Sequence, residues 1–84
     1  MSLEALRNPR QRVIGLKQTT KVVERGQART VYVAKDAEER LVRELLTKCQ
    51  EQGVDVIRAE SMAALGKACG IDVGAAAVAL TKSD

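Results

Sequence analysis

The sequence predicts an α/β fold in which a β-sheet is covered by helices on both faces. Short β-branched or apolar runs alternate with amphipathic segments of helical spacing, in the order α-β-α-β-α-β-α-β. The connections between these segments are short, so consecutive elements are expected to pack beside one another. A chain of 84 residues with 45% apolar content has the size and composition of one globular domain, spanning residues 1–84.

The N-terminal segments are the shortest. Residues 2–8 predict a small helix, which the turn signal Asn8-Pro9 ends. Residues 11–14 predict a short strand, which leads directly into Gly15.

A short amphipathic helix is predicted between Gly15 and Gly26. Gly26 stands just past its end, where a left-handed residue commonly closes a helix. The apolar face of this helix consists of Thr19, Val22 and Val23.

The middle of the chain predicts a buried strand followed by the longest helix. Residues 27–29 form a polar loop, and the β-branched run 30–34 is typical of a strand buried on both faces. Asp36 is expected to cap the helix with Glu39 as its capping-box partner, and Gly53 ends it. The predicted inward stripe consists of Leu41, Val42, Leu45, Leu46 and Cys49.

The C-terminal part repeats this alternation. Residues 54–59 predict a strand, and Ser61 caps a helix that ends at Gly70. Residues 71–74 form a short loop before the last strand, 76–80. The helix is expected to turn Leu65, Ala68 and Cys69 inward.

Catalytic, metal and membrane functions are poorly supported. The chain contains no histidine, so it lacks both a proton shuttle near neutral pH and a usual zinc ligand. Cys49 and Cys69 stand alone at apolar helix positions, which predicts buried thiols in a reducing cytoplasm. No secretory signal or membrane-spanning run is present. We therefore expect a cytoplasmic protein that is not an enzyme, with no cofactor and no catalytic or metal-binding residues.

Positive charge gathers around the helix that follows Gly15. Residues 1–30 hold seven cations and two acids, a net charge of +5, whereas residues 31–84 hold seven cations and nine acids, a net charge of −2. The first amides of a helix are unpaired and favour anions, and Lys17 and Gln18 stand beside them. This arrangement favours RNA as the partner. The alternative is a protein–protein assembly module in which the same basic helix face docks an acidic partner.

Two blocks of the sequence resemble the signatures of the kink-turn RNA-binding ribosomal-protein family. This family includes archaeal ribosomal and guide-ribonucleoprotein members and small bacterial members of the YbxF type. One block runs from Gly15 to Gly26, and the other from Leu65 to Val73. The turn Ala34-Lys35-Asp36 is also similar, and the resemblance extends over roughly residues 3–81.

The resemblance implies a three-layer α-β-α sandwich with a four-stranded mixed sheet. It also implies that the residues matching Gly15, Lys17, Gln18 and Lys21 enter the groove beside tandem sheared G·A pairs at a sharp bend. The loop 71–73 would pack apolar side chains on an unstacked nucleotide. The expected RNA-binding residues are Gly15, Leu16, Lys17, Gln18, Lys21, Arg25, Ile71, Asp72 and Val73.

The partner implied by the resemblance is a structured RNA with a kink-turn, such as ribosomal RNA or a riboswitch, bound by a monomer. Lys17-Gln18 stands where archaeal members carry Asn-Glu. The change from Glu to Gln replaces a carboxylate acceptor with a carboxamide, and Lys17 adds a cationic donor. This Lys-Gln pair matches the small bacterial members.

Overall fold

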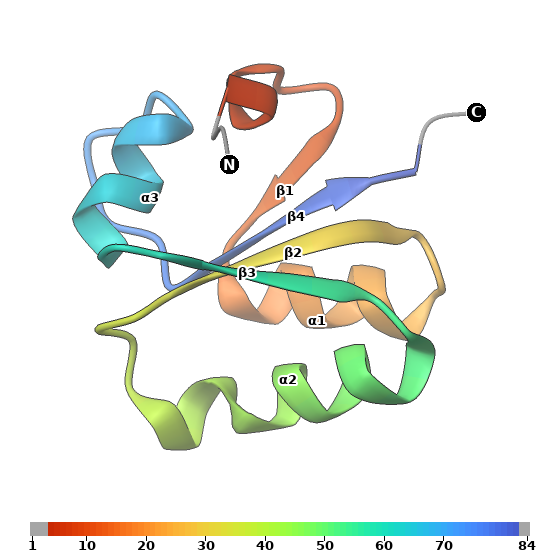
Figure 1. The fold of residues 1–84 in the computed structure, drawn as a ribbon. Helices are drawn as coiled ribbons and strands as arrows, with labels where there is room; N and C mark the ends of the chain where they lie inside the picture. The colour runs from red at the N-terminus through yellow and green to blue at the C-terminus, as the bar shows by residue number, and fades with distance from the viewer. Residues whose placement is uncertain (1–3, 83–84) are drawn as a thin grey trace.

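The computed structural model describes residues 4–82, which form a four-stranded sheet between two layers of helices (Figure 1). The elements in chain order are the 3-10 helix η1 (Glu4–Arg7), β1 (Arg12–Ile14), α1 (Leu16–Glu24), β2 (Ala28–Ala34), α2 (Glu39–Gln52), β3 (Asp55–Ala59), α3 (Met62–Ala68) and β4 (Ala77–Thr81). This architecture confirms the three-layer α-β-α sandwich with a mixed sheet.

The sheet places the strand that comes last in the chain at an inner position. Its order is β1-β4-β2-β3, and β4 runs antiparallel to both of its neighbours. The pair of β2 and β3 is parallel, and α2 makes the crossover between these two strands. The sheet is mixed because one hydrogen-bonded pair is parallel and two are antiparallel.

Alternate residues of the inner strands fill two separate cores. On β2, Val31 and Val33 face α1 and α2, whereas Tyr32 and Ala34 face the side covered by α3 and η1. All four are buried, as the nearly continuous apolar run predicted. Leu6 of η1 is fully buried in the second core, and residues 2 and 3 of the predicted first helix lie outside the described residues.

The predicted cap of α2 is wrong. Glu38, not Asp36, is the N-cap residue, and its side chain makes no capping hydrogen bond. The Asp36 carboxylate instead accepts a hydrogen bond from the backbone N–H of Met62, with an N···O distance of 2.7 Å. Asp36 therefore caps α3, beside Ser61, whose hydroxyl accepts from the Ala64 N–H at 3.0 Å as predicted.

Three further expectations need correction. Residues 27–29 are not wholly a loop, since β2 begins at Ala28, which pairs with Thr81 of β4. Leu41 does not join the inward stripe of α2, because 54% of its surface is exposed. The last strand also begins one residue later than predicted, at Ala77. The other bounds agree within a residue or two, and α2 is closed by Gly53.

Gly66 lets the α3–β4 loop lie directly against α3. A Cβ atom built at Gly66 would lie 2.0 Å from the carbonyl oxygen of Val73, far inside contact distance. The Ile71 N–H also donates to the Gly66 carbonyl, at 3.1 Å. Gly66 therefore holds the segment between Ile71 and Val73 in place.

Candidate nucleic-acid interface

The N-terminal end of α1 is open and has no side-chain cap. Gly15 is the N-cap residue, with φ 111° and ψ 147°, a conformation that L side chains rarely adopt. Its own N–H donates to the Ala77 carbonyl at 2.9 Å, which fixes the helix start against β4. The amides that follow Gly15 have no partners within the helix, so this end carries the positive pole of the helix dipole.

Gln18 folds back over this helix start. An ideal Cβ at Gly15 would lie 2.6 Å from the Gln18 side-chain oxygen, so the carboxamide occupies the space that a side chain at Gly15 would need. A carbonyl oxygen near the positive end of a helix is electrostatically favourable. Gly15 therefore permits both the backbone turn before α1 and the position of the Gln18 side chain.

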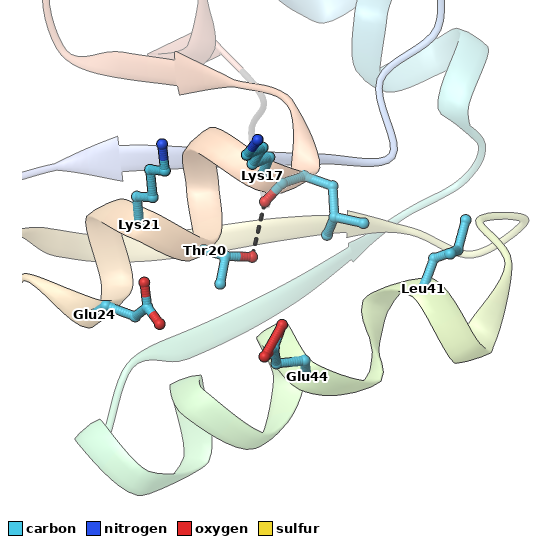
Figure 2. A pocket seen from close by; sticks show the side chains of 7 residues that line it. Lys17, Thr20, Lys21, Glu24, Leu41 and Glu44 are labelled. Atoms are coloured by element: carbon cyan, nitrogen blue, oxygen red, sulfur yellow. Dashed lines mark hydrogen bonds between the residues drawn. The ribbon is translucent and has the colours of Figure 1, made fainter.

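The polar face of α1 carries a row of exposed cations, with the Gln18 carboxamide beside them. Lys17, Gln18, Lys21 and Arg25 are all exposed, while Thr19, Val22 and Val23 are buried as predicted. Lys17 and Lys21 point to the same side of α1, away from α2 (Figure 2). Among residues 4–82, none of these cations forms an ion pair. Their charge is therefore available to an external anion.

The α3–β4 loop lies at the same end of the molecule as the start of α1. Ala77, which accepts the hydrogen bond from Gly15, follows Val73 by four residues, so their Cα atoms are at most about 15 Å apart. Ile71 is half-buried against the second core, whereas Asp72 is exposed and Val73 is 69% exposed. The structure thus brings the two predicted groups of site residues to one end of the fold.

Arg12, part of the basic surplus in residues 1–30, is not a free surface cation. Its guanidinium donates to the backbone carbonyls of Leu6 and Cys69, and so joins η1 to the C-terminal end of α3. Arg12 is only partly exposed. Sequence spacing does not reveal this role, because the two carbonyls come from distant parts of the chain.

A groove between α1 and α2 adjoins the cationic row and was not foreseen from the sequence. It encloses about 420 Å³ (Figure 2). Its lining consists of Leu16, Lys17, Thr20, Lys21, Glu24, Leu41 and Glu44. Glu24 is held by Lys48 of α2 at 2.9 Å, and this hydrogen bond raises the pKa of Lys48. Leu41, the exposed residue of the expected inward stripe, borders this groove.

The two cysteines are free and buried, as predicted. Burial raises the pKa of both thiols, and the charge of Arg12 partly offsets the rise at Cys69. A raised pKa and low accessibility are the properties of structural thiols. Over residues 4–82, no group of three or more acidic or cysteine side chains is placed to hold a metal ion. None of the helices in the same range has the length and apolar character that crossing a membrane requires.

Comparison with known proteins identifies relatives over nearly the whole chain. An RNA-binding protein of Bacillus pumilus is 45% identical over 80 residues, which is 95% of this chain and 98% of that protein. The RNA-binding protein YbxF of Geobacillus stearothermophilus is 42% identical over 82 residues, which is 98% of this chain and 100% of that protein. These names describe binding and not catalysis, which supports the expectation of a protein that is not an enzyme.

A solved structure has the same fold. The Giardia lamblia 15.5kD RNA binding protein superimposes with a TM-score of 0.89 at 29% identity, covering 98% of this chain and 72% of that one. The model of the ribosomal protein L7Ae/L30e/S12e/Gadd45 family matches residues 2–84. The chain belongs to the ribosomal protein L7Ae/L30e/S12e/Gadd45 family.

Proposed function

We propose that this protein binds RNA and recognises the kink-turn, a sharp bend flanked by tandem sheared G·A pairs. The observation that carries the proposal is the open N-terminal end of α1, with Gly15 left-handed in φ and Lys17, Gln18 and Lys21 exposed beside it. Relatives named as RNA-binding proteins, at 42–45% identity, support the binding of RNA.

Each group of site residues has a distinct task in this proposal. Lys17, Lys21 and Arg25 meet the phosphates of the two backbones that converge at the bend, since cations neutralise phosphate charge without reading sequence. Gln18, held over Gly15, contacts base edges, because a carboxamide can both donate and accept hydrogen bonds. Sharply bent RNA exposes such edges, which regular A-form helices conceal.

The α3–β4 loop supplies an apolar surface in the same proposal. Val73 is exposed for most of its area, and Ile71 is half-buried against the second core. An unstacked nucleotide that covers these side chains would remove apolar surface from water, while Asp72 at the loop tip remains polar. Gly66 keeps this loop against α3, so the apolar surface is formed before RNA arrives.

A binding comparison tests the proposal. The protein is titrated against a kink-turn RNA and against a straight duplex of the same length and composition, by gel shift at 0.1–0.2 M salt. Preference for the kink-turn RNA by at least about tenfold is the expected result, equal to about 1.4 kcal/mol. Equal affinity for the two RNAs would contradict kink-turn recognition and leave only general attraction to polyanions.

The α1–α2 groove favours a second candidate, a protein–protein assembly module. Leu16 and Leu41 offer apolar contacts there, and Glu44 gives it an acidic group that would repel RNA. Leu41→Asp separates the two functions. Loss of RNA binding is not expected from this variant, because Leu41 lies on α2, away from the ammonium groups of Lys17 and Lys21 (Figure 2).

The finer assignments belong to the same proposal. Residues 1–84 would form one RNA-binding domain that acts as a monomer, and the target would be ribosomal RNA or a riboswitch. A cytoplasmic location is supported by the free, buried state of Cys49 and Cys69, which fits a reducing compartment.

A further inference from the structure

A second group of cations lies at the end of the molecule opposite the start of α1. There α1 ends, β2 begins and β4 ends close together (Figure 1). The Lys82 N–H donates to the Gln27 carbonyl and the Thr81 N–H donates to the Gln11 carbonyl, both at 2.9 Å. These bonds bring three distant segments side by side. We call the exposed cations of these segments, Arg10, Arg29 and Lys82, the basic rim.

Within residues 4–82, the cations of the basic rim form no ion pairs with neighbouring acids. Residues 8–12, 25–30 and 81–82 contain no Asp or Glu. The nearby Glu24 is already paired with Lys48 at 2.9 Å. Asp55 of β3 pairs with Thr30, next to Arg29, but it forms no ion pair with any cation among residues 4–82. The rim is therefore a local concentration of positive charge.

A β-bulge presents Arg29 at this rim. Ala28 pairs with Thr81 and Thr30 pairs with Leu80, so Arg29 has no partner residue on β4. A bulge bends its strand and re-aims the side chain of the extra residue. Burial does not explain the bulge, because the Arg29 side chain is exposed.

The cations of α1 connect the rim to the proposed kink-turn site. Lys17, Lys21 and Arg25 are spaced by four residues and share one side of the helix. Their Cα atoms span about 12 Å along α1, at about 1.5 Å per residue. A nucleic-acid duplex carries several phosphates over that length, since B-DNA has one per about 1.7 Å of axis. The row of cations thus leads from the helix start toward the rim.

From this continuity we propose that the basic rim binds the phosphate backbone of the RNA stem that flanks the bend. The inference rests on the proposed function and extends its footprint beyond the residues expected to contact the bend itself. In this proposal Arg10, Arg29 and Lys82 meet phosphates, which are the same along any stem, and not base edges. Its contribution is therefore independent of sequence and dependent on stem length.

The test compares two double variants that remove the same charge. Arg29→Gln/Lys82→Gln alters the rim, and Arg43→Gln/Arg58→Gln removes two exposed cations from α2 and β3. Affinity for a kink-turn RNA with two long stems is measured as a function of salt. The rim variant should lower the log–log salt slope by about 1.8, or about 0.9 per phosphate contact. If the two proteins bind equally at 1 M salt, this slope change lowers the affinity of the rim variant at 0.15 M salt by up to roughly 30-fold relative to wild type.

Stem shortening supplies the second arm of the test. Each stem is trimmed in turn to two base pairs beyond the bend. When the stem that passes the rim is trimmed, wild type and rim variant should bind equally, while trimming the other stem should leave their difference unchanged. Thermal unfolding by circular dichroism verifies that both double variants are folded.

Three results would overturn the inference: a rim variant with the wild-type slope, an equal loss in the Arg43/Arg58 control, or a loss that persists when both stems are short. These outcomes are distinct from failure of the proposed function. If the proposed function itself were wrong, wild-type protein would show no preference for the kink-turn RNA over the straight duplex.

Discussion

Replacing Gly66 with alanine should destabilise the protein, although alanine is the better helix former. Gly66 lies inside α3, where the exchange would ordinarily stabilise a helix by up to about 1 kcal/mol. In this fold the added Cβ would lie 2.0 Å from the Val73 carbonyl oxygen and 3.2 Å from the Gly74 Cα. Both neighbours are backbone atoms, so a rotamer change cannot relieve the contact.

The size of the effect follows from the displacement that the new atom requires. Ordinary van der Waals contact begins at 3.4 Å, so a 2.0 Å approach forces the loop away by more than 1 Å. Overpacking of this kind costs up to about 3 kcal/mol, and helix propensity returns about 1 kcal/mol. The expected loss is about 2 kcal/mol in unfolding free energy, a fall in Tm of roughly 8–16 °C for a domain of this size.

Urea unfolding followed by far-UV circular dichroism measures this loss. Ala63→Gly, at an exposed position of the same helix, calibrates the propensity contribution and should cost about 1 kcal/mol. Because the clash involves Val73, the Gly66→Ala variant should also bind kink-turn RNA more weakly. An unfolding free energy equal to or above that of wild type would refute the argument, since propensity would then have outweighed the contact.

Four other predictions concern single residues. Lys21→Ala should weaken binding to kink-turn RNA and reduce the log–log salt slope by about 0.9, and an unchanged slope in a gel-shift titration would exclude a phosphate contact. Gly15→Ala should cost about 1–2 kcal/mol of stability from its φ of 111° and should also displace Gln18, so that RNA affinity falls; affinity equal to wild type would show that Gln18 makes no contact. Arg12→Met should lower the unfolding free energy by about 2 kcal/mol, because two carbonyls lose a charged donor, and denaturation at the wild-type midpoint would rule this out. Burial raises the pKa of the Cys49 thiol, so the folded state retains its proton longer than the unfolded state, and stability should decline as pH rises above about 8.5; a Cys49→Ala variant should lose part of that decline in pH-dependent urea melts.

Local sequence patterns were sufficient to predict most of the helices and strands. The helix of residues 16–24, the buried strand at Val31 to Ala34 and the Ser61 cap all follow from residue type and spacing over a few positions. The features that were predicted wrongly depend on partners that are distant in the sequence. Asp36 has the chemistry of a cap, but the amide that it satisfies belongs to Met62, twenty-six residues later. Ala28 looked like loop because its partner strand, which contains Thr81, lies at the other end of the chain.

The candidate site was predictable in part for the same reason. Gly15, Lys17, Gln18 and Lys21 occupy one short segment, so their shared surface could be inferred from helical spacing. The α1–α2 groove could not be inferred, because its shape depends on how two helices pack on the sheet. Arg12 was likewise counted as surface charge, since its two carbonyl partners become neighbours only after folding.

The position of β4 has a consequence for how the chain is made in the cell. A ribosome synthesises β1, β2 and β3 before it reaches residues 77–81, yet β1 has no strand neighbour except β4. A nascent chain that ends before Ala77 thus carries an incomplete sheet with exposed strand edges, which are prone to aggregate. Productive collapse must await synthesis of residues 77–81, so termination before Ala77 should yield insoluble fragments and not a shortened working protein.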